Sequence, residues 1–106
     1  MSRFPCPYLR GEVQWGEERE RHVAVRHPDL LPEYRVRIAE TLAQPDQVRR
    51  SARFAAARMF SRWYPELRGG KHVVVVVVSE ELRRNWIVTA YLAPRLAQGE
   101  VEWTRS

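Results

Sequence analysis

The run of six consecutive valines at residues 73–78 is the feature that most restricts how this chain can fold. β-Branched side chains have few rotamers and fit the pleated surface of a sheet better than a helix. An unbroken apolar run is typical of a strand buried on both faces, whereas a half-buried strand alternates. The run therefore predicts a central strand of a sheet over residues 72–78.

A second strand is expected directly after this one. The polar stretch at residues 79–85 predicts a turn, and residues 86–93 then return antiparallel to the valine run. Side chains alternate across a strand. The more apolar face, expected to be core, carries Trp86, Val88, Ala90 and Leu92. The mixed face, a candidate site lining, carries Ile87, Thr89 and Tyr91.

The first half of the chain predicts a lead-in and two short helices. Pro5, Pro7 and Gly11 indicate an irregular or extended segment over residues 1–15. Residues 16–26 favour a helix, with acids early and bases late, and Pro28 ends it near His27. Residues 33–43 favour a second helix, because apolar residues around them recur at spacings of three and four.

Residues 47–63 leave two interpretations open. Ala55, Ala56 and Ala57 have good helix propensity, so propensity alone favours a helix. The same stretch also reads as a hairpin of two strands, at residues 48–54 and 57–63.

Length and composition indicate one intracellular domain. A chain of 106 residues, 44% of them hydrophobic, suits a single core. No apolar run approaches the roughly 18 residues that span a bilayer, and the start of the chain lacks the apolar stretch of a secretory signal. The single cysteine, Cys6, favours a reducing compartment, so we expect a cytoplasmic protein without membrane contact.

The net charge of +5 admits two explanations. Lys71 is the sole lysine, so arginine supplies nearly all the positive charge, and its planar fork suits phosphate contacts. A polyanion is therefore one expected partner. An arginine-rich proteome, in which arginine simply fills solvated positions, explains the charge equally well.

His22 and His27 form the first candidate pair for chemistry. Histidine titrates near neutral pH and is the usual general acid or base. On one helix the two would lie about 140° apart, but a break before Pro28 frees His27 to turn. Two unrelated surface or cap histidines are the competing explanation.

A second set of candidates could contact phosphate. Thr89 and Tyr91 share one strand face, and their hydroxyls can donate hydrogen bonds. Arg58 and Arg62 share a face whether their segment is helix or strand. An ordinary half-exposed strand and two solvated arginines explain the same pattern. The sequence shows no spacing typical of a metal site and no nucleotide-binding glycine motif, so no metal or cofactor is expected.

The order of these segments resembles the phage-associated barnase–EndoU–colicin–RelE-like nucleases. The resemblance runs from about residue 12 to 103, through Trp15, ERxxHVxxRHPD at residues 18–29, IAETLxxPD at residues 38–46, the valine strand and IVTAY at residues 87–91. It implies an α+β fold in which two N-terminal helices pack on an antiparallel sheet of about four strands. Residues 1–106 would then be a single domain, with residues 1–11 as an irregular lead-in.

The same resemblance implies a small, toxin-like, metal-independent endoribonuclease. The implied catalytic residues are His22, His27, Thr89 and Tyr91, and the implied phosphate-binding residues are Arg26, Arg58 and Arg62. RNA is the expected substrate, with a cognate inhibitor or antitoxin protein as a second expected partner. A non-catalytic RNA- or protein-binding module on the same fold, or a phage accessory protein, is the alternative.

Overall fold

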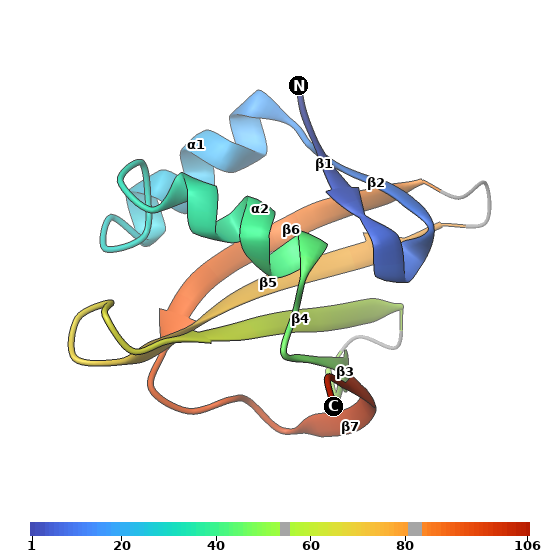
Figure 1. Ribbon diagram of the computed structural model, residues 1–106. Coiled ribbons are helices and arrows are strands. Elements are labelled where there is room, and N and C mark those ends of the chain that lie inside the picture. The colour runs from blue at the N-terminus through green and yellow to red at the C-terminus, as the bar shows by residue number, and fades with distance from the viewer. Residues whose placement is uncertain (54–55, 81–83) are drawn as a thin grey trace.

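The computed structural model describes residues 1–53, 56–80 and 84–106, and one sheet runs through them (Figure 1). Its seven strands follow the spatial order β1-β2-β6-β5-β4-β3-β7. In chain order the elements are β1 (Ser2–Cys6), the 3-10 turn η1 (Pro7–Leu9), β2 (Gly11–Trp15), α1 (Glu17–Arg26), α2 (Arg35–Ala43), β3 (Gln47–Ser51), β4 (Ala57–Tyr64), β5 (Lys71–Ser79), β6 (Asn85–Ala93) and β7 (Gly99–Thr104).

The expectation of two N-terminal helices on a four-stranded antiparallel sheet is wrong. The sheet has seven strands and is mixed, because β2 runs parallel to β6, where Gln14 pairs with Trp86. Helices come only after the first two strands. Two segments that lie at the ends of the chain account for the additional strands.

The first of these segments is the presumed lead-in at residues 1–15. It forms β1 and β2, which pair antiparallel across η1. Phe4, Cys6, Val13 and Trp15 are buried, and the residues between them are half-buried or exposed. This alternation is that of a half-buried strand pair, which the prolines at positions 5 and 7 conceal in the sequence.

The second segment is β7 at the C-terminal end, which pairs antiparallel with β3. Its first residue, Gly99, sits where a Cβ would collide with the carbonyl oxygen of Arg50. Only glycine therefore lets this strand approach β3 at that point.

The valine run is confirmed as an interior strand. β5 lies between β4 and β6 and pairs antiparallel with both. Val73, Val75 and Val77 are buried in the main core beneath the helices, whereas Val74 is buried on the opposite face of the sheet. Burial on both faces is what an unbroken valine run indicates.

A bulge in β6 makes the predicted division of its faces partly wrong. The register shifts between Val76 and Val77, so that Val76 faces Thr89 and Val77 faces Ile87. Ile87 therefore lies in the core, while Trp86 and Val88 are only half-buried. An extra residue in one strand reverses the alternation beyond it.

Residues 47–63 adopt the hairpin interpretation, with β3 and β4 paired antiparallel. The helix favoured by propensity is wrong there, because cross-strand pairing overrides local preference. The predicted first strand extended to Phe54, and residues 54–55 lie outside the described part of the chain. Residues 81–83 of the predicted turn lie outside it as well.

Both helices form close to their predicted bounds and cover one face of the sheet (Figure 1). α2 packs on β1, β4 and β5, with Ile38 and Leu42 fully buried, and α1 packs on β6. In the described residues, no helix is both long and apolar enough to cross a membrane.

Candidate functional site

The sheet face opposite the helices carries the predicted hydroxyl residues, and we call it the open face. Residues opposite one another in an antiparallel pair share a face. Thr89 faces Val76 and Tyr91 faces Val74, while the core valines Val73, Val75 and Val77 alternate with them. Thr89 and Tyr91 therefore both project from the open face.

Thr89 and Tyr91 line a largely apolar groove on this face. The groove has a volume of about 520 Å³ and is also lined by Ser51, Met59 and Val76. Its size lies within the range of small-molecule sites, which usually combine apolar walls with a few polar groups. The two hydroxyls supply polar groups of that kind.

The structure brings His27 to Tyr91. Helix α1 ends at Arg26, and the His27 amide still donates to the Val23 carbonyl at 2.7 Å. The chain then turns, as the proline at position 28 requires. The His27 and Tyr91 rings lie side by side, with centroids 6.0 Å apart and planes tilted by 37°. Residues from α1 and β6, far apart in sequence, thus meet at the edge of the open face.

Burial further favours the protonated form of the Tyr91 hydroxyl. Removing the ring from water disfavours the phenolate and raises the pKa of Tyr91 above its ordinary value of about 10. The hydroxyl therefore carries its proton throughout the neutral range and can donate it. His27 is half-buried beside it.

His22 lies in a different place. It is exposed on α1 and lines a hollow of about 670 Å³ together with Arg19, Arg21 and Val25. Neither Thr89 nor Tyr91 lines that hollow. Arg26 is exposed at the last position of α1, next to His27 in the chain.

Arg58 and Arg62 lie on the helix-covered face of the sheet. Arg62 pairs with Val73, a core residue, and donates to the Gln44 carbonyl at 3.2 Å. Arg58 Nε lies 2.7 Å from a carboxylate oxygen of Glu102, so its charge is neutralised within the fold. The structure therefore does not bring these two arginines together with Thr89 and Tyr91.

Two residues that the sequence interpretation did not select, Arg49 and His72, line a second, polar hollow on the open face. His72 faces Ala93, which places it diagonally from Tyr91 on that face. Burial lowers the pKa of His72, the Asp46 carboxylate raises it, and Arg49 lowers it further. The alternation of His72 with Val74 and Val76 was visible in the sequence, but the register against β6 was not.

No group of three or more His, Cys, Asp or Glu side chains that could hold a metal ion occurs within residues 1–53, 56–80 and 84–106.

Comparisons with protein-family models, with curated proteins and with solved structures found no match to this chain.

Proposed function

We propose that this protein is a small endoribonuclease whose proton-transfer groups are His27 and Tyr91. The observation that carries the proposal is the 6.0 Å ring contact between them, which joins the end of α1 to β6. General acid–base catalysis needs two such groups within reach of one substrate. A histidine beside a protonated tyrosine meets that requirement.

The proposed reaction is transesterification within RNA. His27 takes the proton of the ribose 2′-hydroxyl, and the 2′-oxygen forms a bond to phosphorus. The bond from phosphorus to the 5′-oxygen breaks, and Tyr91 donates its proton to that oxygen. The products are a 2′,3′-cyclic phosphate and a free 5′-hydroxyl. The His27 imidazolium then returns its proton to the Tyr91 phenolate, so atoms and charge balance without a further reactant.

Arg26 and Thr89 have supporting roles in this proposal. Charge builds up on the phosphate oxygens during the reaction, and cations or hydrogen-bond donors at that point stabilise the transition state. Arg26 is exposed next to His27, and Thr89 projects from the same face as Tyr91. The net charge of +5 favours the approach of a polyanion.

Cleavage of total RNA in the presence of EDTA tests the proposal. His27→Ala should lower the rate by about 10²–10⁴-fold, the usual contribution of a general acid or base. His22→Ala is the matched control, because it removes a histidine from the same helix but from a separate hollow. We expect it to change the rate by less than about threefold, within the small effects usual for surface positions.

Each alternative result has a definite meaning. An equal loss in both variants would return His22 to the catalytic set. An inactive wild-type protein that still binds RNA or a protein would favour the non-catalytic binding module. The apolar groove at Thr89 and Tyr91 supports that alternative, because such a groove can bind a partner without catalysing a reaction.

A further inference from the structure

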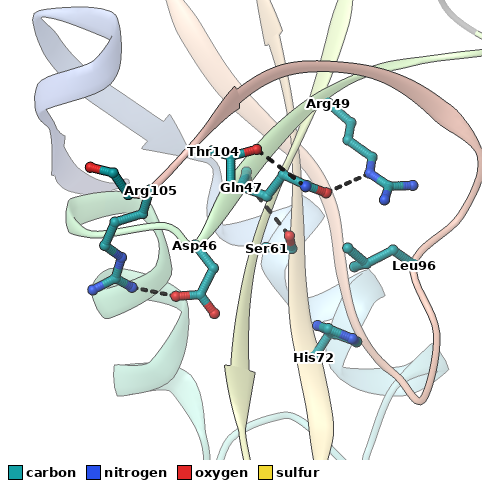
Figure 2. A pocket seen from close by; sticks show the side chains of 9 residues that line it. Asp46, Gln47, Arg49, Ser61, His72, Leu96, Thr104 and Arg105 are labelled. Atoms are coloured by element: carbon teal, nitrogen blue, oxygen red, sulfur yellow. Dashed lines mark hydrogen bonds and ion pairs between the residues drawn. The ribbon is translucent and has the colours of Figure 1, made fainter.

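The polar hollow beyond the apolar groove has no role in the proposed cleavage. Its volume is about 390 Å³, and its walls include Arg49, Ser61, His72 and Leu96 (Figure 2). The connection between β6 and β7 separates the two spaces, because Leu96 lines this hollow while Ala97 and Gln98 line the groove. The open face therefore carries two adjacent but distinct spaces.

Arg49 is held in this hollow by neutral oxygens. Its Nε donates to the Gln47 side-chain oxygen at 2.6 Å (Figure 2). Its Nη1 donates to the Ala97 carbonyl at 3.0 Å. Gln47 is itself oriented by a long contact to the Thr104 hydroxyl, at 3.4 Å. Within the described residues, no carboxylate forms an ion pair with Arg49, in contrast to Arg58 and Glu102.

The acidic side chain of the hollow is already engaged. One Asp46 oxygen accepts a hydrogen bond from the Trp63 backbone amide at 2.7 Å. The other pairs with Arg105 (Figure 2). The Asp46 charge is thus balanced by Arg105, and the Arg49 charge remains to meet a ligand.

His72 provides a second donor. Its ring packs against that of Trp63, with centroids 4.8 Å apart in an edge-to-face arrangement. Arg49 and His72 both line the hollow, and the Arg49 charge is one of the influences that lower the pKa of His72. Two charged groups act on the pKa of His72: the Asp46 carboxylate, which raises it and is itself paired with Arg105, and Arg49 of β3, which lowers it.

We propose that this hollow is a binding site for a phosphate group, held by the Arg49 guanidinium and the His72 imidazole. A guanidinium fork suits the paired oxygens of an oxyanion, and a tetrahedral phosphate also accepts a donor from a second direction. A planar carboxylate offers only two oxygens and matches the pair of donors less well. The site is separate from His27 and binds whether or not the chain cleaves RNA.

Proton NMR of the His72 ring in the full chain tests the site with inorganic phosphate as the probe. We expect a saturable shift of the His72 resonance and a rise in its pKa on binding, because an anion favours the imidazolium. Acetate at the same ionic strength should produce a clearly weaker effect. A His72 resonance that does not respond to phosphate would overturn the proposal.

Arg49→Gln should weaken phosphate binding by at least about tenfold, as expected for the loss of a charge-assisted hydrogen bond. Arg3→Gln is the matched control, because it removes one positive charge from an exposed position on the edge strand β1. Equal weakening in both variants would overturn the site.

Since Arg49 also anchors Ala97, Arg49→Lys is the second variant, which keeps the charge and loses the fork. Affinity equal to wild type in that variant would contradict the fork geometry.

Two further probes identify the source of the phosphate. A mononucleotide carries a terminal phosphate, whereas a short single-stranded RNA carries internal ones. Tighter binding of the RNA, lost in Arg49→Gln, supports a backbone phosphate as the ligand. Tighter binding of the mononucleotide supports a free nucleotide. These measurements need no cleavage, so their failure is distinguishable from a failure of the ribonuclease proposal.

Discussion

The position of Tyr91 in the sheet, rather than its neighbours in the chain, makes it a candidate general acid. The bulge between Thr89 and Ile87 sends Ile87 into the core and leaves Thr89 and Tyr91 on the open face. From there the Tyr91 ring reaches His27. A single extra residue in β6 thus places Ile87 in the core and the candidate site residues Thr89 and Tyr91 on the opposite face of the sheet.

Tyr91→Phe tests the hydroxyl without removing the ring. We expect the RNA cleavage rate to fall by about 10²-fold or more, because a general acid is lost. Stability should change by less than about 1 kcal/mol, since packing is kept. Because burial disfavours the phenolate, the raised pKa of Tyr91 leaves stability unaffected below about pH 10, the pKa of an unfolded tyrosine, and stability falls as pH rises from there through the folded value. Tyr34→Phe is the control. Single-turnover kinetics and thermal unfolding are measured for both variants. An equal loss of rate in both would remove Tyr91 from the mechanism.

Strand β7 lies at an edge of the sheet, where it pairs with β3, and one of its carboxylates ties it to other parts of the chain. Glu102 accepts a hydrogen bond from the Tyr8 hydroxyl at 2.6 Å and pairs with Arg58 at 2.7 Å and Arg50 at 2.9 Å. Tyr8 comes from η1, so Glu102 links the two ends of the chain across the sheet. Burial alone would raise the pKa of Glu102, but the hydrogen bonds from Tyr8 and Arg58 outweigh it and lower that pKa.

Glu102→Gln should therefore change how stability depends on pH. A lowered folded pKa gives a contribution that is present above the unfolded value near 4.5 and is lost as pH falls through the folded value. We expect the variant to lose about 1–3 kcal/mol at pH 7 and progressively less as pH falls below the unfolded value. Glu100→Gln removes an exposed carboxylate from the same strand and is the control. Chemical unfolding over a pH series from 7 down into the acid range measures the difference, and a loss that does not shrink as pH falls would refute the assignment.

The arginines of the whole molecule fall into two groups, those that pair with carboxylates and those whose charge can meet a partner. Arg35, Arg37 and Arg58 pair with carboxylates. Arg49 is held by neutral oxygens, and Arg19, Arg21 and Arg26 are exposed on α1. The positive charge available to a polyanion therefore lies on the open face and on the exposed surface of α1.

RNA binding by the His27→Ala variant should weaken steeply with salt. Each phosphate neutralised releases counterions, so the logarithm of the affinity falls linearly with that of salt, by about 0.7 per contact for single strands. Adding Arg49→Gln should make this slope shallower by about one contact, and adding Arg3→Gln should not. Fluorescence anisotropy over a salt series measures the slopes. A binding constant that is the same at low and moderate salt would exclude an electrostatic RNA interface.

Local pattern alone determined the interior valine strand, its antiparallel partner, both helices and the break after His27. Each of these follows from side-chain shape or short-range periodicity, which act within a few residues. The two-stranded form of residues 47–63 did not follow in this way. Helix propensity there is outweighed by the pairing of β4 with β5 and of β3 with β7, and β7 lies far along the chain.

Tertiary structure alone decided which candidates meet. The positions of Thr89 and Tyr91 on one face were readable from alternation, but their approach to His27 depends on how α1 packs against β6. Arg58 and Arg62 look equally available in the sequence, yet the pairing of β4 with β5 turns them to the helix-covered face. The register of β5 against β6 places His72 on the open face, diagonally from Tyr91. A one-residue change of register reverses every side chain of a strand, and register is set by long-range pairing that no short segment encodes.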